Sequence, residues 1–293
     1  MQKSWHAATT IATYCYIISS NYLIILSVKP FCFSLSIGLI VCFKLSGQPV
    51  PPVYDTLILI DDEIPIYLKS IPAGSFIMGS SAPDPLHEPD EAPAHEVSLT
   101  DGFFMGVYEV TQQQWQAAME DNPAVFQTFD DSPTHPVEYI TWNQAQAFVA
   151  RLNERWTGTF RLPSDEDSEY SCRESTTTAY FCFTDMAENG SSEYTWANSR
   201  SFAQTHPVGA KKPNPWGLYD MSGNVWEWCQ DWYAPYEGRS QINPKGPSKG
   251  EMKVFRGGSW FDFHEAHRSA NRHKHAPDEP YAAIGLRLVW EDK

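Results

Sequence analysis

Two long apolar runs open the chain, and segments with alternating or helical patterns follow them. The runs cover residues 11–28 and 31–43 and are separated by Lys29 and Pro30. Each run is short for a membrane-spanning helix, and Pro30 would kink a helix that joined them. We expect residues 1–52 to be a hydrophobic segment with a spacer. It would act as a signal peptide or a membrane anchor, unless the reading frame starts further downstream, so we expect an exported (periplasmic or extracellular) or membrane-anchored protein.

Residues 57–80 change to the pattern of a folded domain, which we expect to occupy residues 53–293. Apolar and polar positions alternate in part of this stretch, and breaks at Asp61-Asp62 and Ala73-Gly74 predict short strands in a hairpin or at a sheet edge. Residues 82–96 contain five acidic residues, four prolines and two histidines. This composition predicts a polar loop with a solvated acidic face.

Three stretches carry the signals of helix starts. Thr111 with Gln114 and Thr141 with Gln144 each form the spacing of a capping box, and an apolar stripe at helical spacing follows both. These two stretches predict the main helices of the domain. Ser164, followed by three acidic residues, predicts the start of a third, shorter helix, because negative charge is favoured in a first turn.

Residues 214–233 combine many aromatic and glycine residues with few carboxylates. The large rings must be buried and their polar edges must find partners, so this stretch predicts a core segment. Asp220 and Glu227 lie on either side of a Ser-Gly-Asn turn at 222–224. Two carboxylates and the backbone carbonyls between them suit a hard cation, which makes this turn a candidate calcium loop.

Length and charge limit the class of protein further. A chain of 293 residues without an internal linker favours one large domain after the N-terminal segment. A formal net charge of -15 argues against a nucleic-acid surface, which needs a basic footprint. Three cysteines, Cys172, Cys182 and Cys229, fall in the predicted domain. They form no Cys-X-X-Cys motif, so neither a disulfide framework nor a structural zinc site is indicated.

Several motifs resemble the formylglycine-generating enzyme (sulfatase-modifying factor) family in both order and spacing. They are IPAGSFIMGS at 71–80, YEVTQQQW at 108–115, FRLPSDEDSEY at 160–170, GLYDMSGNVWEW at 217–228, NPKGP at 243–247, VFRGGSW at 254–260, RSANR at 268–272 and IGLRLV at 284–289. The resemblance covers residues 67–289. It implies one α+β domain with a C-type-lectin-like fold, rich in loops, with short strands and two main helices.

The resemblance also implies metal sites. The family's second calcium site matches the side chains of Asp220 and Glu227 and the backbone oxygens of Gly223 and Val225, with calcium in a structural role. Its first calcium site matches Asn198, but the chain is shorter after this residue and lacks the expected aspartate. We therefore expect the second site and not the first.

The catalytic cysteines of the family do not have counterparts here. Active members use two cysteines after the Gly-Gly-Ser-aromatic motif to bind copper, because a thiolate pair selects monovalent copper. Asp262 stands at the first of these positions, and His264 or His267 stands at the second. No cysteine follows Cys229, so we expect no copper-dependent oxidation of a substrate cysteine.

Two classes of function remain open. The first is a module that binds a protein or a small-molecule ligand through its loops. The second is an oxidase or tailoring enzyme with a non-haem metal, since Asp262, His264 and His267 supply the ligand types of a two-histidine, one-carboxylate iron site. Their spacing suits neither one strand face nor one helix face for all three residues, so we favour the binding module.

Overall fold

The N-terminal part and the domain form two separate units in the computed structural model. The structure describes residues 13–19, 22–27, 54–60, 63–81, 86–182 and 193–292. The chain divides into Met1–Pro51 and Pro52–Lys293. In the first unit, β1 (Thr13–Ser19) pairs antiparallel with β2 (Tyr22–Ser27), while the second apolar run and the spacer lie outside the described residues. Within the described ranges, no helix is long and apolar enough to cross a membrane.

The largest sheet of the second unit has five strands in the order β3-β4-β7-β14-β8, and all of its pairs are antiparallel. Its strands are β3 (Thr56–Ile60), β4 (Ile64–Ile71), β7 (Phe103–Gly106), β8 (Thr159–Arg161) and β14 (Val289–Glu291). The predicted breaks are confirmed, because β3 ends at Ile60 and β4 ends at Ile71, before β5 begins at Gly74. The last strand of the chain thus lies between β7 and β8.

Two smaller sheets complete the second unit. One has the order β10-β6-β5, with β5 (Gly74–Met78), β6 (His95–Leu99) and β10 (Gln241–Ile242). The other has the order β12-β11-β9-β13, with β9 (Trp226–Trp232), β11 (Lys253–Arg256), β12 (Arg272–His275) and β13 (Ile284–Gly285). The second of these sheets holds the aromatic segment and the strand that leads into the Gly-Gly-Ser-Trp motif.

Three α-helices form where the sequence predicts them: α1 (Gln112–Met119), α2 (Trp142–Asn153) and α3 (Asp165–Arg173). All three capping boxes are present, at Thr111, Thr141 and Ser164. The prediction that the third helix is shorter is wrong, since α3 has nine residues and α1 has eight. An αL residue ends each of these two helices, so local chain geometry sets their lengths.

The core forms between the helices and the aromatic strand β9. The Trp115 ring of α1 stacks on the Phe148 ring of α2 at a centroid distance of 5.1 Å, and Trp226 and Trp228 of β9 are buried in the same cluster. Residues 214–233 are therefore a core segment, as predicted, and the α+β fold class is confirmed by helices and sheets that share one core.

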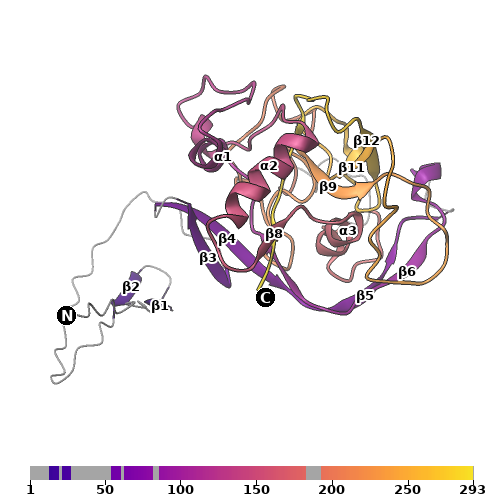
Figure 1. The fold of residues 1–293 in the computed structure, drawn as a ribbon, viewed down its shortest axis with the longest axis horizontal. Helices are drawn as coiled ribbons and strands as arrows, with labels where there is room; N and C mark the ends of the chain where they lie inside the picture. The colour runs from indigo at the N-terminus through magenta and orange to yellow at the C-terminus, as the bar shows by residue number, and fades with distance from the viewer. Residues whose placement is uncertain are drawn as a thin grey trace, which may run out of the picture. The chain divides into compact units, whose positions relative to one another are not determined.

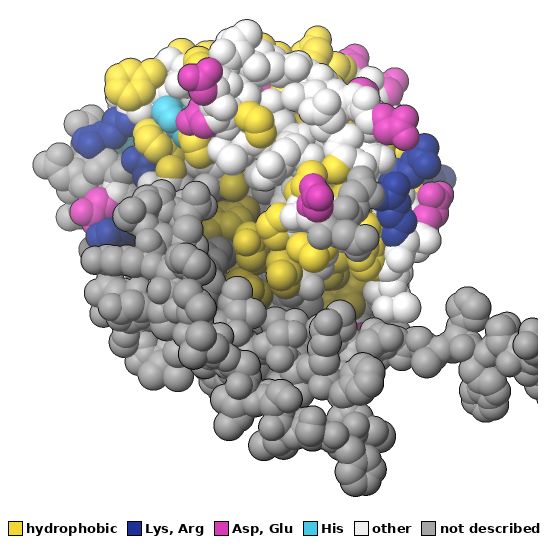
Figure 2. Space-filling model, turned by 90° about the vertical axis from the view of Figure 1, so that its left-hand side faces the viewer, with side chains coloured by type: hydrophobic (Ala, Val, Ile, Leu, Met, Phe, Trp, Pro, Cys, Tyr) yellow, Lys and Arg dark blue, Asp and Glu magenta, His cyan; other side chains and the backbone are white. Residues whose placement is uncertain are grey.

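Successive side chains of the edge strand β3 point alternately into the core and toward the surface. Ile58 and Ile60 are buried, whereas Leu57 and Leu59 are exposed. Figure 2 shows the side of the molecule on which β3 lies in Figure 1, and hydrophobic side chains gather on this face. The outer residues of β3 are therefore part of the protein surface and not of the core.

Candidate functional site

The turn after β11 carries the first group of predicted site residues. Gly257 and Gly258 both have positive φ, at 104° and 78°, and a Cβ on Gly258 would lie 2.5 Å from the His267 ring. Glycine therefore lets the chain turn closely over His267. The turn places Asp262 so that its Oδ2 accepts hydrogen bonds from Trp226 Nε1 at 2.8 Å and from the Ser259 hydroxyl.

The structure does not bring Asp262, His264 and His267 together as a three-ligand set. His267 is buried, with its Nε2 3.2 Å from the Ser259 carbonyl oxygen, and burial lowers its pKa. His264 instead has its Nδ1 3.6 Å from a Glu265 carboxylate oxygen. In the described part of the chain, no group of three or more His, Cys, Asp and Glu side chains is placed to hold a metal ion.

The three cysteines of the domain are free thiols. Cys172 and Cys229 are buried, and burial raises the pKa of both thiols. Burial likewise raises the pKa of Cys182, which is half-buried. A thiol that keeps its proton at neutral pH is a poor metal ligand and a poor nucleophile.

Three exposed phenylalanines lie on two loops that are hydrogen-bonded to each other, and they form what we call the aromatic surface: Phe202, Phe261 and Phe263. Their exposed fractions are 83%, 53% and 65%. Hydrogen bonds hold the two loops that carry them, because Asn198 Nδ2 donates to the Phe261 carbonyl at 2.8 Å and the Ser201 hydroxyl donates to the Trp260 carbonyl at 2.7 Å. Sequence reasoning missed this surface, although Phe261 and Phe263 flank Asp262 directly.

Glu138 fixes a third loop beside the aromatic surface. Its Oε1 accepts from Val125 N at 2.6 Å and from Phe126 N at 3.0 Å, and the Phe126 ring meets the Trp260 ring edge-on at 5.2 Å. Burial raises the pKa of Glu138 to about 7, although both backbone N–H groups act to lower it.

Replacing Glu138 with glutamine is expected to change how stability depends on pH. The pKa of Glu138 is higher in the folded than in the unfolded state, so the folded state holds this proton more tightly. The contribution of Glu138 to stability therefore falls as pH rises from about 4.5 to about 7. Between pH 5 and pH 8, the unfolding free energy of the wild type should fall relative to Glu138→Gln by about 2 kcal/mol. Urea titrations at several pH values measure this difference, and a difference independent of pH would contradict the assignment.

The predicted calcium loop lies in a buried cluster of charges. Glu227 is paired with Arg287, whose Nε lies 2.9 and 3.0 Å from the two carboxylate oxygens and whose Nη2 lies 2.7 Å from Oε1. Asp220 Oδ2 accepts from the Gly209 amide at 2.7 Å. Gly223 N donates to the Gly257 carbonyl at 2.9 Å, so the calcium loop is tied to the turn that precedes Asp262.

A third carboxylate, Glu109, belongs to this cluster and was missed by sequence reasoning. Its Oε1 accepts from Val225 N at 3.0 Å, and its Oε2 accepts from Asn224 Nδ2 at 2.7 Å. Burial, followed by the charges of Asp220 and Glu227, raises the pKa of Glu109 well above its ordinary value. The motif that contains Glu109 lies more than a hundred residues before the loop, so no local pattern connects them.

This cluster contains more carboxylates than cationic side chains. Glu109, Asp220 and Glu227 share the guanidinium of Arg287, and the charge of Lys211 also acts on Asp220. Burial raises the pKa of Asp220 to about 6, although the Gly209 hydrogen bond and the charges of Arg287 and Lys211 act to lower it. A divalent cation held by Asp220, Glu227 and the carbonyls of Gly223 and Val225 would supply the missing positive charge.

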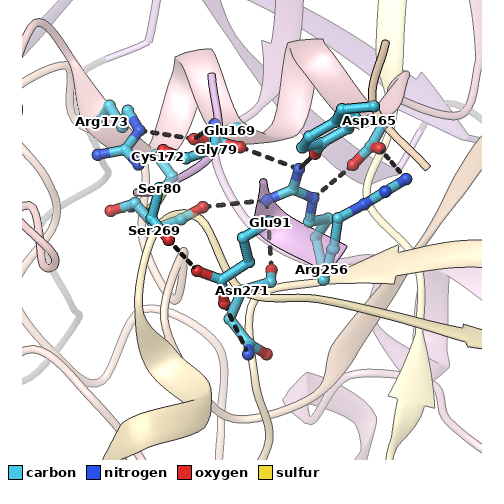
Figure 3. Close-up of polar contacts among 12 residues, drawn as sticks. Gly79, Ser80, Glu91, Asp165, Glu169, Cys172, Arg173, Arg256, Ser269 and Asn271 are labelled. Atoms are coloured by element: carbon cyan, nitrogen blue, oxygen red, sulfur yellow. Dashed lines mark hydrogen bonds and ion pairs between the residues drawn. The ribbon is translucent and has the colours of Figure 1, made fainter. Parts of the chain in front are cut away.

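A second buried network, shown in Figure 3, holds α3 against β11 and β12. Arg256 donates to Asp165 Oδ1 at 2.5 Å and lies 2.9 Å from Glu169 Oε2, while Arg272 donates to Asp165 Oδ2 at 2.6 Å. Burial acts to raise the pKa of Asp165, but the two guanidiniums outweigh it and hold this pKa below its ordinary value. The network thereby fixes the strand that leads into the Gly-Gly-Ser-Trp turn.

The comparison with family models agrees with this architecture. Residues 67–292 match the model of the sulfatase-modifying factor enzyme 1-like domain. The chain belongs to this family. The formylglycine-generating enzyme of Bos taurus is 28% identical over 287 residues, which cover 77% of this chain and 75% of that protein.

Solved structures support the same fold. Treponema denticola variable protein 1 superposes with a TM-score of 0.71 at 28% identity, covering 83% of this chain and 100% of that chain. PvdO from Pseudomonas aeruginosa superposes with a TM-score of 0.69 at 26% identity, with the same coverage. The formylglycine-generating enzyme fold, C-type-lectin-like, is therefore the fold of this domain.

Proposed function

We propose that this domain is a non-catalytic binding module of its family and that it binds a polypeptide partner through the aromatic surface. The observation that carries the proposal is the exposure of Phe202, Phe261 and Phe263 on two loops that are hydrogen-bonded to each other. Exposed aromatic rings that gather in one place are typical of protein interaction sites. Asp262, which replaces the first copper-binding cysteine of active relatives, is already hydrogen-bonded to Trp226 and Ser259.

The shape of the aromatic surface favours a macromolecule over a small ligand. Small molecules bind in concave pockets that bury most of their area. Phe202, at 83% exposed, and Phe263, at 65% exposed, instead project from the surface. A projecting ring contributes binding energy when a partner provides the pocket that buries it, as aromatic anchors do at protein interfaces.

Site-specific photo-crosslinking in the cells that naturally produce the protein tests this proposal. A photoreactive phenylalanine analogue at position 202 or 263 should crosslink the same partner, whereas the analogue at Ile242, which is 71% exposed on β10, should not. The partner is then purified for affinity measurements. Phe263→Ser should weaken its binding at least tenfold, which corresponds to about 1.4 kcal/mol, and Ile242→Ser should leave it within twofold.

Two outcomes would contradict the proposal. One is the absence of any adduct at positions 202 and 263. The other is an adduct that forms equally at Ile242, because the crosslinking would then reflect general surface exposure and not the aromatic surface.

We further propose that calcium binds at Asp220, Gly223, Val225 and Glu227 in a structural role. The excess of buried carboxylates over guanidiniums supports this proposal. When bound, the ion would supply positive charge to the loop and would have no catalytic role. Glu227 would remain paired with Arg287, and Glu109 would continue to accept hydrogen bonds from the Asn224 side chain and the Val225 amide.

A further inference from the structure

A groove of about 1030 Å³ lies on a part of the domain that the aromatic surface does not include. Its walls come from α2, β8, the start of α3, the end of β14 and the loop at residues 243–245. None of Phe202, Phe261 and Phe263 lines it. The strand labelled β8 lies close to the C-terminal end of the trace in Figure 1.

The lining of the groove carries more negative than positive charge. Its carboxylates are those of Asp101, Asp167, Asp231, Glu291 and Asp292, and its cations are Arg161 and Lys245. Arg161 is engaged twice, with Asp167 Oδ2 at 2.5 Å and with Glu291 Oε1 at 2.8 Å. Lys245 alone is therefore left to offset Asp101, Asp231 and Asp292 among the lining residues.

Asp231 is the lining carboxylate with the least compensation. It is only 5% exposed and lines the groove. Its Oδ2 accepts from the Asp165 amide at 2.9 Å. Burial of a carboxylate is costly unless a cation pairs with it, so a cation that approaches from the groove would lower this cost.

The groups packed around Asp231 explain its high proton affinity. Burial and the charge of Asp165 raise the pKa of Asp231 to about 6, with a smaller contribution from Asp167, while Lys253 acts in the opposite direction. Lys253 does not pair with Asp231 directly, because its Nζ donates to the Gln230 carbonyl at 2.8 Å. Asp231 is thus mainly ionised at neutral pH without a matching cation.

The backbone groups of Phe160 on β8 are not available to a ligand in this groove. β8 is the last strand of its sheet and would offer unpaired backbone groups to a ligand. Asn153 of α2 occupies them, since its Oδ1 accepts from Phe160 N at 2.7 Å and its Nδ2 donates to Phe160 O at 2.9 Å. A ligand therefore cannot extend the sheet at Phe160, and carboxylates are the groups left to recognise it.

We propose that this groove binds a basic polypeptide segment, whose lysine or arginine side chains pair with Asp231 and with Asp101 and Asp292 at the rim. These three carboxylates come from β9, from the turn before β7 and from the end of the chain. Only a ligand with several spaced cations can reach all three. The volume is also at the upper limit of small-molecule pockets, which suits a length of chain.

Binding of a fluorescent peptide with alternating lysine and glycine tests this proposal. The peptide is titrated with the full-length protein at a fixed salt concentration. Asp231→Asn and Asp292→Asn should each weaken binding at least fivefold. Asp278→Asn, which removes the same charge from an exposed residue outside the groove, should change binding by less than twofold. Asp292 is exposed near the chain end, so its variant remains informative if Asp231→Asn unfolds.

Three results would overturn the proposal. Equal weakening by Asp278→Asn would show a general effect of net charge. Full competition by spermidine at the same concentration of positive charge would show a polyamine site. A loss of binding in Phe263→Ser would place the peptide on the aromatic surface. Binding in the groove is independent of the proposed function, because Phe263 does not line the groove. Phe263→Ser can therefore lose binding to the aromatic surface while peptide binding in the groove is kept.

Discussion

Replacing Arg256 with leucine is expected to lower the free energy of unfolding by about 3 to 5 kcal/mol. Arg256 is fully buried and pairs with both Asp165 and Glu169, and it also donates to the Tyr236 hydroxyl at 2.8 Å (Figure 3). Leucine would leave Glu169 paired with Arg173 alone and Asp165 with Arg272 alone. The cost arises mainly from these buried carboxylates and not from the lost contacts themselves. Equilibrium unfolding in urea measures the change.

Arg151→Leu is the matched control for this prediction. Arg151 is 63% exposed and lies 3.9 Å from Glu154, which is 67% exposed. Exposed pairs of this kind contribute about 0 to 1 kcal/mol, because water screens both charges. If Arg256→Leu destabilised the domain no more than Arg151→Leu, the ion network of Figure 3 would not be the support of the Gly-Gly-Ser-Trp turn.

Calcium is expected to stabilise the wild-type domain by about 2.7 kcal/mol at a concentration one hundred times its dissociation constant. An ion that binds only the folded state shifts the unfolding equilibrium by mass action. The buried carboxylates of Asp220 and Glu227, which otherwise share one guanidinium with Glu109, provide the reason for this preference. Thermal unfolding with calcium and with a chelator measures the shift.

Glu227→Ala should abolish the calcium shift, while Glu237→Ala should retain it in full. Glu237 is an exposed carboxylate that pairs with Arg239 on the surface, so the control removes one negative charge without touching the loop. Equal calcium shifts in the wild type and in Glu227→Ala would refute the calcium site. For each protein, unfolding with calcium is compared with unfolding of the same protein in chelator. This is necessary because Glu227→Ala also removes the main partner of Arg287 and lowers stability without any ion.

Local sequence signals predicted the parts of the fold that depend on neighbouring residues. The three helix starts follow from side chains that bond the backbone three residues away, as at Thr111, Thr141 and Ser164. The strand break before Gly74 follows in the same way from turn residues. Local signals did not predict the length of α3. The helix ends at its C-cap residue Glu174, which adopts the αL conformation although the sequence has no glycine there to mark a helix end.

Contacts between distant residues explain what the sequence did not reveal about the candidate sites. Glu227 and Arg287 are 60 residues apart, and Glu109 and Val225 are 116 residues apart. The interaction of the Arg287 guanidinium with Glu109, Asp220 and Glu227 becomes visible only in the folded structure. His264 was grouped with Asp262 and His267 because of its position in the chain, yet in the structure it lies against Glu265.

Mass spectrometry of a sulfatase-motif peptide incubated with the purified domain, copper and oxygen tests whether the domain lacks cysteine oxidase activity. The resemblance to the family implies two catalytic thiolates at the positions of Asp262 and of His264 or His267. The thiols of Cys172 and Cys229 are buried and that of Cys182 is half-buried, and all three have raised pKa values. We expect the peptide cysteine to stay unchanged. Conversion of this cysteine to an aldehyde, dependent on the protein and lost in Asp262→Ala, would contradict this expectation.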